Sequence, residues 1–155
     1  MKIVIVGGVA GGATAATRLR RLDEHAQITV FERSGYISYA NCGLPYYIGG
    51  VIGDEEELTL QTPESIWNRF RIDMKVHHEV TDINAVKKTV TVYNLDTGKV
   101  YEESYDKLIL SPGAKPVMPN LPGIENEKIF RLRTVEDALK IRSFVEEKKP
   151  KTAVM

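Results

Sequence analysis

The sequence predicts an α/β fold that combines a parallel, helix-covered sheet with an antiparallel β-meander. Two observations lead to this prediction. Residues 1–32 run as strand, glycine-rich turn, helix, strand and acidic residue, which is the order of a βαβ unit. Residues 80–105 instead alternate apolar and polar side chains around a glycine-containing turn, which is typical of antiparallel hairpins. At 155 residues the chain can bury a core of its own.

The parallel part begins with a β-branched run over residues 2–6, which predicts a strand buried on both faces. The glycine turn Gly7–Gly12 follows, and Ala13 to Asp23 is expected to form a helix. Gln27 to Phe31 predicts a second buried strand. The apolar stripe of the helix is expected to consist of Ala15, Leu19 and Leu22.

Cap and turn signals predict the later elements. Thr62 before Pro63 is typical of an N-cap and predicts a short helix that ends near Arg71. Asp96-Thr97-Gly98 is expected to be a hairpin turn of a three-stranded meander. The remaining predictions are a strand over Lys107–Leu110, a helix over Thr134–Lys148 capped by Thr134, and a new strand over 151–155. Residues 1–150 are therefore expected to be part of one domain, and 151–155 the first strand of another, in a chain that is a piece of a longer protein.

Composition argues against several classes of partner. Twenty-one basic residues balance twenty-one acidic ones, so net charge favours neither nucleic acid nor an acidic membrane. No apolar run approaches the ~20 residues of a membrane span, and no secretory signal follows Met1. His25, His77 and His78 lack metal-ligand spacing, so no metal site is expected. A single free cysteine suits a reducing compartment, and we expect a cytoplasmic protein.

The glycine turn has the pattern of a phosphate loop. Gly7 suits the tight turn, Gly12 suits close packing of helix on strand, and Val9 occupies the second glycine position of the usual fingerprint. N–H groups at the start of the helix can then receive a pyrophosphate. Glu32 lies twenty residues beyond Gly12, where a carboxylate accepts hydrogen bonds from a ribose diol. The sequence therefore predicts a dinucleotide site.

The single cysteine, Cys42, lies in the segment Ser38–Pro45. A lone cysteine is more often a small buried apolar residue. Its Gly, Pro and Asn neighbours suit a tight loop that enters a helix, where N–H groups and the helix dipole stabilise a thiolate. A thiol this close in sequence to a dinucleotide loop indicates redox chemistry at sulfur.

These segments resemble the FAD-binding part of the pyridine nucleotide-disulfide oxidoreductases, and in particular their single-cysteine group, which contains the coenzyme A-disulfide reductases. The resemblance covers essentially the whole chain and is most specific in the cysteine segment. The residues that carry it are Val6–Gly12, Phe31–Arg33, Ser38–Tyr47 and Leu110–Ala114.

The resemblance implies FAD as cofactor, partly because the meander replaces a third crossover helix, and NADH or NADPH as electron donor. The donor's site would lie largely outside this chain, and the parent enzyme would be a homodimer. It also implies the cofactor-binding positions Gly7, Val9, Ala10, Gly11, Gly12, Glu32, Arg33, Val80, Ser111, Gly113 and Arg131.

The resemblance further implies that Cys42 is the catalytic nucleophile. Two-cysteine relatives cycle an internal disulfide, but the positions five residues away are Ile37 and Tyr47, so the partner must be external. The thiolate would form a mixed disulfide, or a sulfenic acid after meeting peroxide or oxygen. The implied substrate is coenzyme A disulfide or persulfide, bound at Thr14, Arg18, Arg21, Ser38 and Asn41.

Other interpretations stay open. The i, i+4, i+7 spacing of Thr14, Arg18 and Arg21 suits a phosphate clamp or a solvated basic face. Ser38 and Asn41 would orient the thiol or cap the next helix. The second enzyme hypothesis is an NADH oxidase or peroxidase with a Cys42 sulfenate. In those enzymes a histidine occupies the position that matches Ala10, and alanine cannot act as acid or base. A third hypothesis is a non-catalytic nucleotide-binding fragment.

Overall fold

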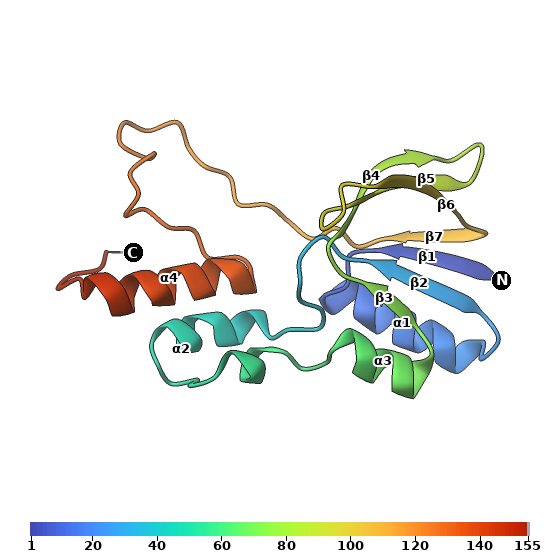
Figure 1. Ribbon diagram of the computed structural model, residues 1–155, viewed down its shortest axis with the longest axis horizontal. Helices are drawn as coiled ribbons and strands as arrows, with labels where there is room; N and C mark the ends of the chain where they lie inside the picture. Colours follow the sequence, from blue (N-terminus) through green and yellow to red (C-terminus); the bar gives the residue numbers. More distant parts are fainter. Residues whose placement is uncertain (155) are drawn as a thin grey trace. The chain divides into compact units, whose positions relative to one another are not determined.

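The computed structural model describes residues 1–154, which form two compact units. The first unit contains residues 1–39 and 59–113, and the second contains residues 40–58 and 114 onward (Figure 1). The predicted glycine turn and Glu32 belong to the first unit, whereas Cys42 belongs to the second.

A parallel sheet forms the centre of the first unit, with strand order β3-β2-β1-β7. Its strands are β1 (Lys2–Val6), β2 (Gln27–Phe31), β3 (Asp73–Lys75) and β7 (Lys107–Leu110). Three of them were predicted at these bounds, and the register pairs Val6 of β1 with Phe31 of β2. The sequence did not predict β3, because three residues that include Asp and Lys give no apolar run.

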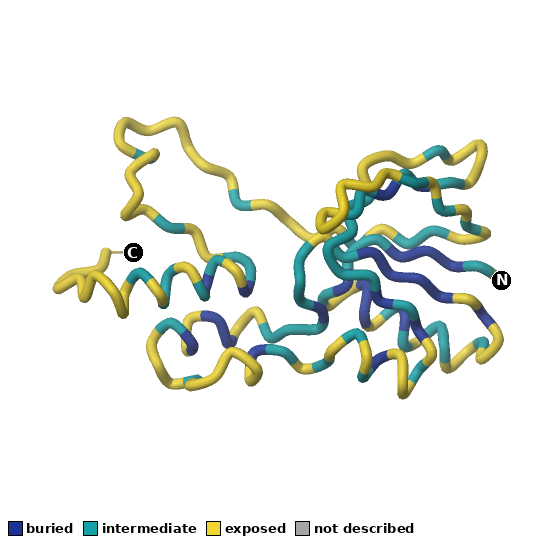
Figure 2. Tube along the Cα trace, viewed as in Figure 1, coloured by how far each residue is buried: buried dark blue, intermediate teal, exposed yellow. Residues whose placement is uncertain are grey.

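Helices α1 (Ala10–Leu22) and α3 (Pro63–Phe70) cover one face of this sheet (Figure 1). Ile5 of β1 belongs to the same buried core as Ala13 and Ala16 of α1. Figure 2 shows β1 and β2 as the most deeply buried strands of the unit. This burial on both faces is what the continuous apolar runs predicted.

Helix α1 differs from the prediction in its start and in its buried face. It begins at Ala10, so the last glycines of the turn are helical. Its buried residues are Gly12, Ala13 and Ala16, whereas Leu22, expected in the apolar stripe, is 67% exposed. The other two expected stripe positions are partly buried. Small residues face the sheet because the glycine turn brings the helix close to β1.

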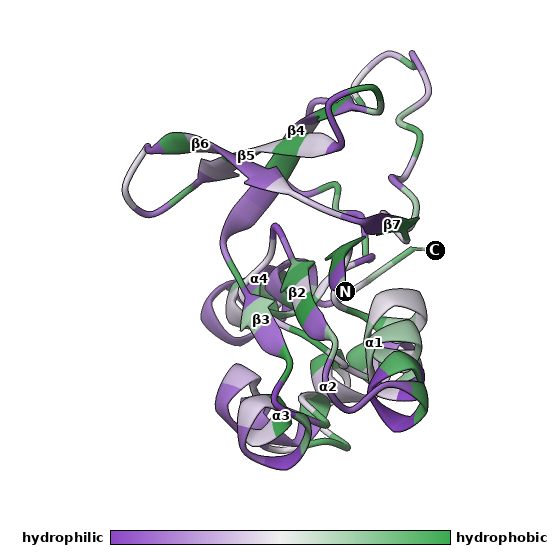
Figure 3. Cartoon of the chain, turned by 90° about the vertical axis from the view of Figure 1, so that its right-hand side faces the viewer, coloured by the Kyte–Doolittle hydropathy of each residue, from purple (hydrophilic) through white to green (hydrophobic). Residues whose placement is uncertain are grey.

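The predicted three-stranded antiparallel meander is present, and it packs on the opposite face of the sheet. Its strands are β4 (His78–Asn84), β5 (Thr89–Asn94) and β6 (Val100–Ser104). Val90 and Val92 are fully buried with Val4 and Phe31 in a second core. Figure 3 shows hydrophobic segments on β2, and mainly hydrophilic residues along α3.

The second unit is mainly helical. Its elements are η1 (Asn41–Gly43), α2 (Leu44–Ile48), η2 (Glu55–Leu58) and α4 (Val135–Lys148). Helix α2 contacts both η2 and α4, and Leu44, Tyr47 and Leu58 are buried. Residues 152–154 have no regular structure and Met155 lies outside the described residues, so the second-domain strand stays a prediction.

Both predicted N-caps are confirmed. Thr62 Oγ1 accepts a hydrogen bond from the Ser65 N–H at 3.2 Å, and Thr134 Oγ1 accepts one from the Asp137 N–H at 3.3 Å. In each case the third helical residue bonds back to the cap, which completes a capping box. Each cap stabilises its helix by about 1 kcal/mol.

Candidate functional site

The glycine turn between β1 and α1 leaves no space for a side chain at Gly7. Gly7 has a φ of +95°, and a Cβ there would lie 2.1 Å from the Ser111 carbonyl oxygen. Its N–H donates to the Phe31 carbonyl at 2.8 Å. The turn is therefore packed between the ends of β2 and β7, and Gly7 excludes any side chain.

Gly12 is required for a reason that differs partly from the prediction. A Cβ at this position would lie 1.7 Å from the Gly7 carbonyl oxygen, and 3.3 Å from a methyl group of Ile5. The closest approach is thus between the helix and the backbone of the turn, rather than between the helix and the strand. Gly12 allows the first turn of α1 to fold back onto the loop that precedes it.

The N-terminus of α1 presents open N–H groups. Val9 is the N-cap and provides no side-chain hydrogen bond, and the first turn contains no acidic residue. The Ala13 N–H donates to the Val9 carbonyl at 3.0 Å, so the N–H groups of residues 10–12 precede the helical hydrogen-bond ladder. A thirteen-residue helix with such an end suits an anionic group such as a pyrophosphate.

Glu32 lies directly after β2, and backbone groups hold its carboxylate next to the turn. Oε2 accepts a hydrogen bond from the Gly8 N–H at 2.7 Å, and Oε1 accepts one from the Ser34 N–H at 2.9 Å. Each oxygen retains a lone pair for a further donor. The carboxylate and the open helix end therefore fit the ribose diol and the pyrophosphate of a dinucleotide.

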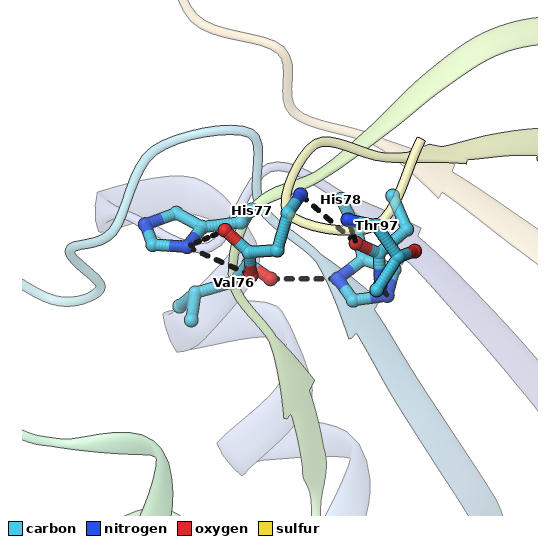
Figure 4. A network of polar contacts seen from close by, with 6 residues as sticks. Val76, His77, His78 and Thr97 are labelled. Atoms are coloured by element: carbon cyan, nitrogen blue, oxygen red, sulfur yellow. Dashed lines mark hydrogen bonds and ion pairs between the residues drawn. The ribbon is translucent and has the colours of Figure 1, made fainter. Parts of the chain in front are cut away.

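Backbone hydrogen bonds with Lys75 and His78 hold the Glu32 main chain, and His77 bonds to the following loop through Ser34. The Glu32 N–H donates to the Lys75 carbonyl and the His78 N–H donates to the Glu32 carbonyl, both at 2.9 Å. Figure 4 shows both histidines: His77 Nδ1 lies 3.0 Å from an Asp96 carboxylate oxygen, and His78 Nδ1 lies 2.6 Å from the Val76 carbonyl. In the sequence these histidines lack metal-ligand spacing, and no local pattern links residues 77 and 78 to the loop that follows β2.

The tautomer of His78 follows from its partners. A carbonyl oxygen only accepts, so Nδ1 carries the proton and donates to Val76. Nε2 then accepts from the Asn94 amide nitrogen at 3.0 Å. The Asn94 amide oxygen is oriented by the N–H groups of Asp96 and Thr97 (Figure 4). His78 thus links Asn94 of the meander to the Val76 carbonyl through hydrogen bonds at both ring nitrogens.

Aromatic packing completes this corner. The Tyr101 ring lies edge-on to Phe31 and His78, with ring centroids 6.5 and 6.2 Å away. Burial raises the pKa of Tyr101, and the Glu103 and Asp73 carboxylates raise that pKa further. The phenol therefore stays neutral at physiological pH.

Several other predicted cofactor positions lie around the same turn. Ser111 donates its N–H to the Val6 carbonyl at 2.8 Å, and its Oγ lies 3.4 Å from the point where a Gly11 Cβ would be. Gly113 adopts a φ of +72°. Arg33 is exposed, at 3.7 Å from a Glu79 oxygen. Of the rest, Val9 and Val80 are partly buried, Ala10 is exposed, and Arg131 is an exposed residue of the second unit.

The predicted substrate stripe on α1 is present as an exposed face. Thr14, Arg18 and Arg21 are all exposed, and neither arginine forms a hydrogen bond or ion pair within residues 1–154. The neighbouring Arg20 instead donates to the Phe70, Asp23, Glu24 and Arg71 carbonyls at 2.6–3.2 Å. Arg20 thus ties the ends of α1 and α3 together, which the sequence did not predict.

Ser38 has an unusual backbone conformation, with a φ of +48°. Its N–H donates to the Gly8 carbonyl and its own carbonyl accepts from the Leu60 N–H, both at 3.2 Å. These bonds hold a conformation that is uncommon for a residue with a Cβ. Ser38 is therefore fixed beside the glycine turn.

Cys42 lies exposed in η1, immediately before α2, as the loop-into-helix prediction required. The Gly43 N–H donates to the Ala40 carbonyl at 2.9 Å, and the Leu44 N–H donates to the Asn41 carbonyl. These two N–H groups are used inside the turn, so they do not provide the expected thiolate stabilisation. Neither η1 nor α2 has a side-chain cap, which argues against a capping role for Ser38 or Asn41.

No group of three or more His, Cys, Asp and Glu side chains within residues 1–154 is arranged to hold a metal ion. Among these same residues, no helix combines the length and apolar character of a membrane span.

The fold and the turn define the class of protein first: a Rossmann-type α/β protein whose glycine turn and strand-terminal acid suit a dinucleotide. Residues 1–154 match the family described as pyridine nucleotide-disulphide oxidoreductase. The chain belongs to this family.

Named relatives give this membership more detail. The chain is 49% identical over 144 residues to the coenzyme A disulfide reductase of Staphylococcus aureus (strain JH9), an alignment that covers 93% of this chain and 32% of the relative. The crystal structure of reduced Bacillus anthracis CoADR-RHD superposes with a TM-score of 0.94 at 55% identity, covering 97% of this chain and 27% of that one. A NAD-dependent persulfide reductase from A. fulgidus gives a TM-score of 0.89 at 36% identity, covering 95% and 28%. The chain thus spans about a third of the length of the curated relatives it matches.

Proposed function

We propose that this chain is the N-terminal part of the FAD-binding domain of an NAD(P)H-dependent oxidoreductase that reduces coenzyme A disulfide or persulfide. The observation that carries the proposal is the exposed Cys42, the single cysteine of a chain whose other unit forms a dinucleotide turn. Similarity to a coenzyme A disulfide reductase and to a persulfide reductase supports this choice of substrates.

The FAD would be held by the first unit. The N–H groups at the start of α1 would bind the pyrophosphate, and the Glu32 carboxylate would accept the ribose hydroxyls. Residues 111–113 and Val80 would line the same cofactor, and Arg33 would contribute a cation. When bound, the flavin supplies a two-electron relay from NADH or NADPH to sulfur.

The chemistry at Cys42 is thiol–disulfide exchange. The Cys42 thiolate attacks one sulfur of the disulfide, a bond forms to Sγ, and one coenzyme A leaves as a thiolate. Two electrons and a proton then restore the Cys42 thiolate and release the second coenzyme A as a thiol. Thr14, Arg18, Arg21, Ser38 and Asn41 would hold the nucleotide part of the substrate, with the arginines on its phosphates.

The alternative enzyme is an NADH oxidase or peroxidase that cycles a Cys42 sulfenate. Ala10 disfavours it, because alanine cannot transfer the protons of oxygen chemistry. A reactive free thiol suits the reducing cytoplasm, which we propose as the location of the parent enzyme. The family resemblance further suggests that the parent enzyme is a homodimer. Residues 151–155 would begin the nicotinamide-binding domain.

The full-length protein that contains this chain tests the proposal. We expect flavin absorbance bands, and a denatured-state mass that shows a coenzyme A adduct on Cys42 which reductant removes. Cys42→Ser should keep its flavin, since the dinucleotide turn is in the other unit. The variant should lose disulfide reduction by at least about 10³-fold, because it lacks the nucleophile.

Other outcomes discriminate the alternatives. Retained disulfide reduction in Cys42→Ser would disprove the covalent mechanism. Flavin together with a cysteine that only oxygen or peroxide oxidises would favour the oxidase. Absence of flavin from the full-length protein would favour the third hypothesis, in which this chain binds a nucleotide without catalysis.

A further inference from the structure

Arg142 joins helix α4 to the segment that follows Cys42. Its guanidinium lies over the Tyr47 ring, with the central carbon 4.3 Å from the ring centroid. Nη1 donates to the Gly53 carbonyl at 2.9 Å and the Ile52 carbonyl at 3.1 Å, and lies 3.4 Å from the Tyr47 carbonyl. One side chain on α4 thus contacts both α2 and the loop that follows it, all within the second unit.

The charge of Arg142 is itself fixed by its helix. Nε donates to Glu146 Oε1 at 2.8 Å, one turn further along α4. This hydrogen bond raises the pKa of Arg142, so the guanidinium stays protonated throughout the working pH range. The side chain is 22% exposed, which places the contacts in a partly desolvated setting where they are stronger than in water.

Helix α2 needs such an external support. It contains five residues, and a helix this short is not stable by itself. At its C-terminal end the Tyr47 carbonyl accepts a hydrogen bond from the Gly50 N–H at 3.1 Å, and Arg142 Nη1 lies 3.4 Å from the same oxygen. Cys42 belongs to the same continuous structure, because the Leu44 N–H at the start of α2 donates to the Asn41 carbonyl of η1.

We propose that Arg142 is the positioning residue for the Cys42 thiol: its guanidinium anchors α2 to α4 and thereby fixes the turn from which the thiol attacks. The proposal rests on the function proposed above, in which Cys42 is the nucleophile. Arg142 touches neither the thiol nor the substrate in this scheme and acts through Tyr47 and α2. Positioning of a reacting group within about 1 Å is worth up to about 10²-fold in rate, which sets the scale of the expected effect.

The test compares Arg142→Ala and Arg142→Lys with Lys140→Ala in the full-length protein. Lys140 is an exposed cation on the same helix, so Lys140→Ala removes a charge and leaves the carbonyl contacts intact. The second-order rate constant of Cys42 is measured by mass analysis with coenzyme A disulfide and with iodoacetamide, at a temperature where all variants are folded. Iodoacetamide is small and neutral, so it requires no particular orientation of the thiol.

We expect Arg142→Ala to slow the reaction with coenzyme A disulfide by about tenfold or more, while the iodoacetamide rate changes by less than about twofold. Arg142→Lys keeps a cation near Glu146 but loses the planar fork, so it should give an intermediate rate. Lys140→Ala should match the parent protein. Flavin content should stay unchanged in all of them.

Two outcomes would overturn the proposal. Equal coenzyme A disulfide rates in Arg142→Ala and the parent would show that the contacts do not position the thiol. An equal slowing with both reagents would indicate general occlusion of Cys42 instead. If Arg142→Ala did not fold, the same comparison with Arg142→Lys would decide. Because the thiol rates need no turnover, they stay informative even if Cys42→Ser disproves the proposed function.

Discussion

At the scale of single residues, Glu32 shows how a side chain is prepared before any ligand arrives. Both of its carboxylate oxygens accept backbone hydrogen bonds, one from the glycine turn and one from the following loop. His78 supports the Glu32 backbone from the meander. Bonds of this charge-assisted kind are about twice as strong as neutral ones, so the carboxylate is held in one place.

Glu32→Gln tests this preparation. The amide replaces one acceptor by an NH₂ donor, which then faces a backbone N–H, and the charge-assisted bonds are lost. We expect the Kd for FAD to rise by about 10- to 100-fold, the equivalent of about 1.5–3 kcal/mol. Fluorescence titration of the flavin-free protein gives this Kd. Glu24→Gln is the control, because its carboxylate is 84% exposed just beyond the C-terminal end of α1, and it should change the Kd by less than about twofold.

At the scale of elements, the first turn of α1 depends on two close backbone approaches. Gly7 lies against the end of β7, and Gly12 lies against Gly7. Gly11, one residue earlier on the same helix, has more room: a Cβ there would meet the Ser111 side chain at 3.4 Å. Substitution by alanine is therefore expected to affect the stability of the protein in opposite directions at Gly11 and Gly12.

Gly12→Ala should destabilise the protein and Gly11→Ala should not. The Gly12 methyl group would lie 1.7 Å from the Gly7 carbonyl oxygen, so the turn must move, at a cost of about 1–3 kcal/mol. Alanine at position 11 gains helix propensity of up to about 1 kcal/mol. Urea denaturation and flavin content measure both effects. Similar stabilities of the two variants would show that the turn can relax.

At the scale of the whole molecule, the proposed binding of an anionic substrate requires a local arrangement of charge. The formal net charge is zero, so no overall field attracts a phosphate ligand. Arg18 and Arg21 lie on an exposed face of α1, next to the structural Arg20. Their side chains are free within residues 1–154 to bind phosphates from solution.

The double substitution Arg18→Ala and Arg21→Ala tests this role in the full-length protein. We expect the KM for coenzyme A disulfide to rise by about tenfold at low salt, and its dependence on ionic strength to weaken. The rate with a small disulfide that lacks phosphates should stay the same. Lys87→Ala removes a distant exposed cation as the control. An unchanged KM would mean that the stripe is a solvated basic face.

The sequence by itself determined the features that depend on neighbours a few residues away. The buried strands, the capping boxes at Thr62 and Thr134 and the hairpin turn depend on short-range backbone preferences, so local patterns predicted them. The close backbone approach at Gly7 and the position of Glu32 beside the glycine turn also follow from spacing along the chain, whereas the catalytic role of Cys42 stays a prediction.

Only the tertiary structure decided the roles that depend on distant partners. Arg20 donates to carbonyl groups near residue 70. Arg142 donates to the Ile52 carbonyl, ninety residues earlier in the chain. Leu22 is exposed although it fits the apolar period, because small residues at Ala13 and Ala16 face the sheet instead. Such contacts depend on which surfaces meet after folding. A local sequence pattern does not predict which distant surfaces will pack together. The hydrogen bonds and close packing of the folded chain determine those contacts.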